Sequence, residues 1–135
     1  MTSERIALVL TALAAIVIVL TRVRMKDEAA GRLAISHALI NVHTLAGVLA
    51  LASWLWFLLG NADWMFGFGG LALWWVTAVA GLLILARWLP ARGKHASDPA
   101  SDTWGEGPGL SILGHVGLLV GCVVWSGLFF AGNLS

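Results

Sequence analysis

Three imidazoles lie in apolar stretches of this chain where water is scarce. The segment "AISHALINVHTLAG" contains His37, Asn41 and His43, and the segment "LGHVGLLVGCVVWSGLFF" contains His115. Neutral imidazoles ligate haem iron and other metals, and ionisable side chains at membrane depth commonly mark functional sites. They also hydrogen-bond neighbouring helices, for about 1 kcal/mol or less each. Ligand binding and helix assembly are therefore both open interpretations.

The elements that position these side chains are expected to be membrane-spanning helices. Hydrophobic residues make up 59% of the 135 residues and charged residues only 11%, against about 25% in soluble domains. Three uncharged runs exceed the roughly 20 residues that cross a bilayer, and a shorter run near the N-terminus is extended by its flanks. The sequence predicts a single all-α transmembrane domain over 1–135, an integral membrane four-helix bundle with helices at 4–23, 33–59, 64–89 and 109–132 and a cytoplasmic loop at 90–108.

The distribution of basic residues predicts the orientation. Seven of the eight Lys and Arg residues flank the connections between the first and second helices and between the third and fourth. Basic residues stay on the cytoplasmic side, so both termini are expected on the non-cytoplasmic side of the cell membrane. The basic flank "TRVRMK" after the first apolar run is typical of a retained helix rather than of a cleaved signal peptide. No basic face is large enough for nucleic acid.

The second and fourth helices are expected to be parallel and to carry their histidines at similar depth. Counting at 1.5 Å per residue, His43 lies about 16 Å from Arg32 and His115 about 10 Å from Pro108. A shift of 72 residues also superposes His43 on His115 and Gly60 on Gly132. This weak internal sequence similarity favours a duplicated helical hairpin. His37 lies about 120° around the helix from His43, so both cannot point at one small target.

A b-type haem between the second and fourth helices is the leading hypothesis for a ligand. His43 and His115 are the candidate axial ligands and the candidate metal-binding residues, with His37 as a substitute for His43. Small residues would give the macrocycle room, and cations at the cytoplasmic end would receive its propionates. The residues expected in these roles are Gly47, Gly114, Gly117, Gly121, Arg32, Arg87 and Arg92, with Asn41 or Ser111 orienting the rings. A zinc site of three histidines is disfavoured because their directions diverge and no carboxylate is near.

The two histidine-bearing segments also resemble known families. "INVHTLAGVLAL" and "LGHVGLLVGCVVWSGLFF" are similar to the His-plus-glycine helices of small membrane b-type cytochromes. The second is also similar to helices of CopD-like and protoporphyrinogen-oxidase-like membrane proteins of four to five helices. The resemblance covers about a third of the chain and implies a haem or copper-related role. It implies that His43 and His115 are the candidate ligands. No second histidine pair matches, so a two-haem arrangement is not implied.

Two functions of different classes therefore compete. The first is a haem b-binding electron-transfer or anchor subunit that exchanges electrons with a quinone or a membrane partner. The second is a non-catalytic accessory subunit of a larger respiratory-type complex, or a homo-oligomer, in which glycine faces and tryptophans make helix contacts. Both are favoured over a stand-alone enzyme. Trp54, Trp56 and Trp64 are expected in an aromatic belt at the outer interface.

Overall fold

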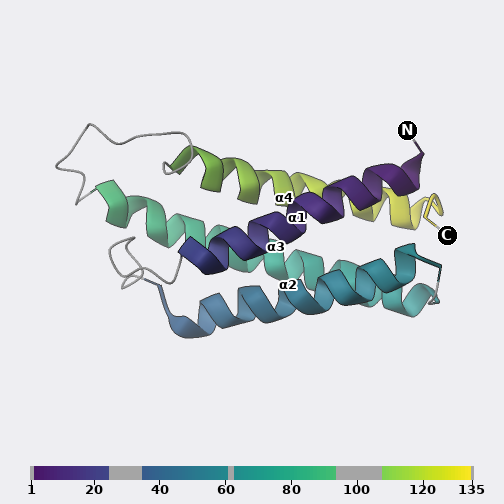
Figure 1. Cartoon of the computed structure of the whole chain (residues 1–135), viewed down its shortest axis with the longest axis horizontal. Helices are drawn as coiled ribbons and strands as arrows, with labels where there is room; N and C mark the ends of the chain where they lie inside the picture. The colour runs from purple at the N-terminus through teal and green to yellow at the C-terminus, as the bar shows by residue number, and fades with distance from the viewer. Residues whose placement is uncertain (1, 25–34, 61–62, 94–107, 135) are drawn as a thin grey trace.

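The computed structural model describes residues 2–24, 35–60, 63–93 and 108–134, and these form four helices (Figure 1). In chain order they are α1 (Ser3–Arg24), α2 (His37–Leu58), α3 (Trp64–Gly93) and α4 (Pro108–Phe130). Each contains a window that is long and apolar enough to cross a membrane. The prediction of an all-α, multi-pass membrane protein is confirmed.

The helices run up and down in sequence and pack as a bundle (Figure 1). Neighbours in the chain are neighbours in space, and α1 also packs against α4, so that α2 and α4 stand on one diagonal and α1 and α3 on the other. Both termini and the α2–α3 turn lie at one end, here called the turn end. The opposite end, here called the loop end, holds the C-terminus of α1 and the N-terminus of α4. Which end faces the cytoplasm stays a prediction.

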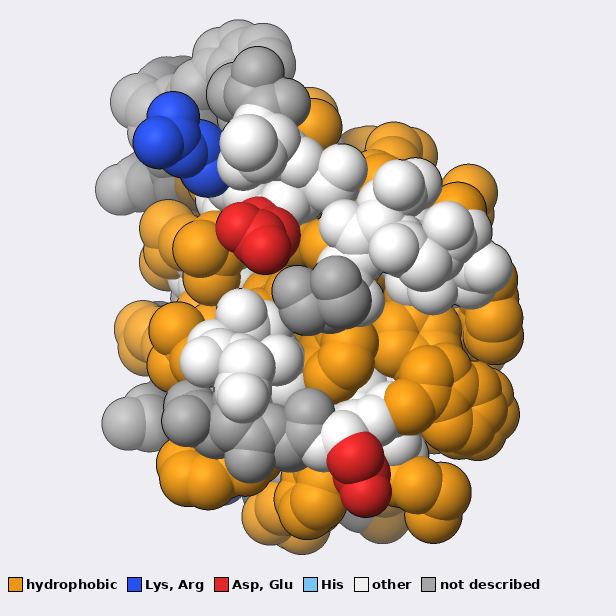
Figure 2. Space-filling view, turned by 90° about the vertical axis from the view of Figure 1, so that its right-hand side faces the viewer, with side chains coloured by type: hydrophobic (Ala, Val, Ile, Leu, Met, Phe, Trp, Pro, Cys, Tyr) orange, Lys and Arg blue, Asp and Glu red, His pale blue; other side chains and the backbone are white. Residues whose placement is uncertain are grey.

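Viewed from the turn end, hydrophobic side chains dominate the surface and charged ones are few (Figure 2). Large apolar residues remain exposed along the helices as well, among them Leu45, Val48, Met65 and Val120. In water such a surface would be an aggregation liability. Here it is the surface that hydrocarbon covers.

The helix boundaries follow local chemistry. α2 begins one residue after Ser36, whose hydroxyl accepts a hydrogen bond from the Leu39 amide at 3.3 Å. The expected start at 33 was therefore too early, since Ile35 and Ser36 are not helical. α4 begins at Pro108, a position that suits proline because the first helical amides need no partner. Beyond its last helical residue the chain turns at Gly132, which has φ +69° and whose amide donates to the carbonyl of Phe129.

The predicted C-terminal end of the third helix was wrong for a different reason. The loop was expected to start at Pro90, but α3 continues to Gly93. Proline removes one amide donor from a helix, and near the end of a helix that loss interrupts little of the hydrogen-bond ladder. The third helix is therefore longer than predicted.

The bundle core has two compositions along its length. Towards the turn end it is aromatic, with Trp54, Trp74 and Trp125 fully buried and packed with Phe129. Trp54 is therefore a core residue and not the interface anchor that the sequence predicted, whereas Trp56 and Trp64 are about half exposed as expected. Towards the loop end the core is mainly aliphatic around Ile40 and Ile84, with Trp88 as its one aromatic member, and between the two parts lie His43 and His115.

Candidate functional site

His43 and His115 meet at the centre of the bundle from diagonally opposite helices. Their ring centroids are 6.1 Å apart and the rings are tilted by 40°. Both side chains are buried, at 1% and 6% exposure. The sequence left open which histidine of α2 faces α4, and the structure places His43 there.

The backbone of α3 lies against both rings. A Cβ added at Gly81 would stand 2.6 Å from His115 Cδ2 and 3.2 Å from His43 Cδ2. Only glycine fits here without a shift, because any side chain would displace one imidazole or the other. The helix backbone therefore occupies the space beside the two ring edges.

A porphyrin between these two rings does not fit this packing. An axial pair needs the plane of the macrocycle between its imidazoles, and a Cβ added at Gly81 of α3 would lie 3.1 Å from Nε2 of His115 and 3.2 Å from Cδ2 of His43. The room expected beside Gly47 is also filled, since a Cβ there would lie 2.7 Å from Ile18 Cδ1. A haem sandwiched by His43 and His115 would require α3 to move away.

Ser111 orients the ring of His115. Nδ1 of His115 lies 2.7 Å from the Ser111 carbonyl oxygen. A carbonyl only accepts, so this contact places the proton of the neutral ring on Nδ1 and its lone pair on Nε2. A histidine that donates one ring nitrogen to a backbone carbonyl is a usual arrangement for a metal ligand.

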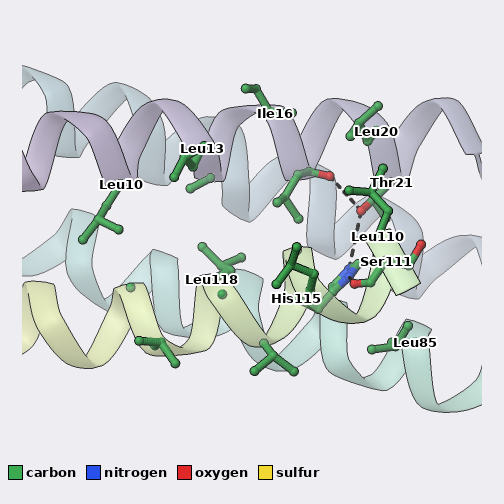
Figure 3. A pocket seen from close by; sticks show the side chains of 18 of the residues that line it. Leu10, Leu13, Ile16, Leu20, Thr21, Leu85, Leu110, Ser111, His115 and Leu118 are labelled. Carbon is green, nitrogen blue, oxygen red and sulfur yellow. Dashed lines mark hydrogen bonds between the residues drawn. The ribbon is translucent and has the colours of Figure 1, made fainter. Parts of the chain in front are cut away.

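Nε2 of His115 points to α1. It lies 3.5 Å from the hydroxyl oxygen of Thr21, which donates its own proton to the Val17 carbonyl at 2.8 Å (Figure 3). His43 differs, because its Nε2 is buried with no hydrogen-bond partner among the described residues. A buried ring nitrogen without a hydrogen-bond partner costs free energy.

A cavity of about 640 Å³ lies between α1 and α4, and His115 is on its wall (Figure 3). We call it the α1–α4 groove. Thr21, Ser111 and His115 gather at its loop end, and aliphatic side chains such as Leu10 and Leu118 line much of the remainder. Residues of α3 near the loop end also contribute to the wall. None of the described residues of α2 lines the groove, so His43 does not reach it.

Glycines on α4 leave the groove wide. A Cβ at Gly117 or Gly121 would find no atom within 4 Å, and both residues line the groove. Gly114 is closer to α1, because a Cβ added there would lie 3.2 Å from Val17 Cγ2. The expectation of room beside Gly117 and Gly121 agrees with this geometry.

The remaining predicted site residues lie apart from the groove. His37 is the first residue of α2 and is exposed, and the side-chain oxygen of Asn41 accepts a hydrogen bond from Arg22 at 3.0 Å instead of orienting a ring. Arg87 is exposed towards the loop end of α3. Arg32 and the side chain of Arg92 lie outside the described residues. No group of three or more His, Cys, Asp or Glu side chains that could hold a metal ion occurs among the described residues.

Sequence reasoning missed Thr21, the contact of Gly81 with the two imidazoles, and the groove itself. Thr21 could have been found, because it is the last polar residue of the first apolar run and lies near the depth of His115. Gly81 gave no local signal that set it apart from the other glycines. No protein-family model, curated protein or solved structure matches this chain.

Proposed function

We propose that this multi-pass membrane protein binds haem b in the α1–α4 groove, with His115 as the axial ligand, and carries electrons in the cell membrane. The observation that supports this most is His115 itself. Its Nε2 lone pair is set by the Ser111 carbonyl, and its ring lies on the wall of an apolar cavity of about 640 Å³. Cavities of about 300–1,000 Å³ are typical of small-molecule and cofactor sites.

The groove offers the apolar surroundings that the hydrophobic part of a porphyrin needs. Its walls are aliphatic, and Gly117 and Gly121 leave open space on α4 where a flat ring could lie. Arg87 lies towards the loop end and is the described cation that could pair with propionates there, since Arg22 is engaged with Asn41. When bound, the haem would supply one-electron chemistry. The protein would set its potential through His115, the Ser111 carbonyl and the apolar wall.

The test is the absorbance of the purified protein in mild detergent after expression with ample haem. We expect a reduced-minus-oxidised haem spectrum that is lost in His115→Ala and retained in His37→Ala, the exposed-histidine control. A short-chain quinol that reduces the bound haem would support a quinone as the electron partner. Colourless wild-type protein under these conditions would refute the proposal.

A second candidate is an accessory subunit of a larger membrane complex, and Gly117 favours it, because this glycine is exposed and a Cβ added there would find no atom within 4 Å. A glycine on the surface of a helix lets another helix approach closely. In that case Gly117→Leu would abolish co-purification with a stoichiometric membrane partner. His115→Ala would leave the partner bound and the preparation colourless.

A further inference from the structure

Arg22 and Asn41 join the last turn of α1 to the beginning of α2 at the loop end. Nη1 of Arg22 donates a hydrogen bond to the side-chain oxygen of Asn41 at 3.0 Å, and both side chains are exposed. A guanidinium has several N–H groups, and this contact uses one of them. Because the amide oxygen of Asn41 faces the guanidinium, its NH₂ group is left to donate elsewhere. We call the surface formed by Arg22, His37 and Asn41 the α1–α2 seam.

No carboxylate neutralises Arg22 within the described part of the chain. The acidic residues that the structure describes are Glu4 and Asp63, and both lie at the turn end. Glu4 is in the first turn of α1, about 27 Å along the helix axis from Arg22 at 1.5 Å per residue. A guanidinium at the edge of a membrane is costly without a counter-charge. The amide of Asn41 is neutral and does not supply one.

The α1–α2 seam lies at the boundary of two membrane-spanning segments. One span ends at Val23 in α1 and the other begins at His37 in α2. Arg22 and His37 therefore stand at the edge of the hydrocarbon, and Asn41 lies about one turn deeper. The polar headgroups of lipids lie directly outside this edge. His37 is exposed on the same face of α2 as Asn41 and adds another N–H donor, so the seam presents its donors at the depth of lipid phosphates.

Exposed apolar side chains continue the seam towards the bilayer centre. Val19 lies three residues before Arg22 on α1 and shares its face. Leu45 lies four residues after Asn41 on α2 and shares that face in turn. Val19 is 60% exposed and Leu45 is 64% exposed. A donor-rich end followed by an apolar surface matches the two parts of a phospholipid, its phosphate and its acyl chains.

From these observations we infer that the α1–α2 seam binds an anionic phospholipid, whose phosphate accepts hydrogen bonds from the guanidinium of Arg22 and the amide NH₂ group of Asn41. Arginine suits this ligand because its planar N–H groups match two phosphate oxygens at once. A headgroup with a net negative charge is favoured over a zwitterionic one, because choline or ethanolamine would bring a second cation beside Arg22.

A lipid at the seam would strengthen the attachment of α1 to the bundle. Of the four spans α1 is the least buried, with 28% of its most apolar window inside the structure. A phosphate held by Arg22 of α1 and Asn41 of α2 would link these two helices at the loop end. Neither residue lines the α1–α4 groove, so the inference does not depend on the proposed haem site.

The decisive experiment is thermal unfolding in mild detergent with added phosphatidylglycerol. We expect the Tm of the wild type to rise, and phosphatidylcholine with the same acyl chains to raise it much less. Arg22→Gln should increase the phosphatidylglycerol concentration that gives half of the full shift about fivefold, the typical contribution of one arginine beside anionic lipid. Arg5→Gln is the matched control and should respond as the wild type does, because Arg5 is also exposed on α1 but lies at the turn end. Equal loss in both variants, or equal responses to both lipids, would overturn the inference.

Asn41→Asp separates lipid binding from the contact between the helices. The aspartate keeps the size of the side chain and an acceptor for Arg22, but it replaces the NH₂ donor with a negative charge that repels a phosphate. We expect its Tm without lipid to equal or exceed that of the wild type, and its response to phosphatidylglycerol to be lost. A full response in this variant would contradict the phosphate contact. A rise in Tm with inorganic phosphate alone, abolished by Arg22→Gln, would show a site for free anions and would also overturn the inference.

Discussion

The α2–α3 interface and the α1–α4 interface are built from the same residue types and differ in how closely the helices approach. At the first, Gly70 brings α3 so near to α2 that a Cβ would lie 2.9 Å from the backbone nitrogen of Trp54. At the second, Gly117 and Gly121 face a cavity of about 640 Å³. Glycine therefore serves close packing on one side of the bundle and leaves room on the other.

This difference assigns separate roles to the two helix pairs. Half of the most apolar window of α3 is buried, against 28% of that of α1. The α2–α3 pair holds the bundle together, because van der Waals packing is the main attraction between helices in lipid. The α1–α4 pair retains a cavity with one polar end. A helix pair that served only to pack the bundle would not need such a cavity. Variants at matched positions in the two interfaces test this distinction.

A large effect on stability is expected from Gly70→Ala. The new methyl group would meet the backbone of Trp54, which cannot rotate away, and such overpacking costs about 1–3 kcal/mol. The measurement is thermal unfolding in detergent, where we expect a clear fall in Tm. Gly117→Ala is the control, because its methyl group enters open space and alanine is the better helix former. If both variants lose stability equally, the two interfaces are not different.

A second variant removes the imidazole of His43. Truncation in His43→Ala leaves a void in the bundle centre, and large-to-small changes at buried sites cost about 2–5 kcal/mol. His43→Leu keeps the volume and removes a buried nitrogen for which the described residues offer no partner, so its stability should equal or exceed that of the wild type. Denaturant titration of both variants checks the order. A large loss in His43→Leu would mean that Nε2 has a partner of its own, such as a bound cation.

A smaller effect is expected from Gly81→Ala. The added methyl group would lie 2.6 Å from a ring atom of His115, but a side chain can turn aside where a backbone cannot. We therefore expect a destabilisation of about 1 kcal/mol together with a changed haem spectrum, since the ligand ring must move. An unchanged spectrum would show that His115 does not touch the haem.

The smallest effect is expected from Thr21→Val. The hydroxyl bonds the Val17 carbonyl of its own helix, so its loss removes no contact between helices other than the 3.5 Å approach to His115 Nε2. Stability should change by about 0.5 kcal/mol or less, while the midpoint potential of the haem should shift because the hydroxyl dipole near the ligand is gone. A potential identical to that of the wild type would place the haem away from the loop end of the groove.

Much of the fold could be predicted from composition and charge placement. The uncharged runs defined the four helices because their length matches the bilayer, and the similar depth of His43 and His115 followed from the helical rise. The helix ends were less accessible. Ser36 delays α2 through a side-chain cap, and Pro90 is tolerated because it lies in the last turn of α3.

The site was only partly predictable, because it depends on which helices stand on a diagonal. His115 and the open faces of Gly117 and Gly121 could be named from the sequence, but the closure of the gap beside His43 by Gly81 could not. The position of Trp54 shows the same limit. Tryptophan near a helix end is typical of an interface anchor, yet Gly70 on the neighbouring helix makes space for this one in the core.

Trp125 belongs both to the aromatic core and to the wall of the groove. Its ring centroid lies 5.0 Å from that of Trp74 and 5.8 Å from that of Trp54, and none of the three is exposed. The indoles therefore form an intrinsic optical probe. A coloured ligand that binds beside Trp125 will quench the tryptophan fluorescence. A lipid chain at the same place, which does not absorb visible light, will leave the fluorescence unchanged.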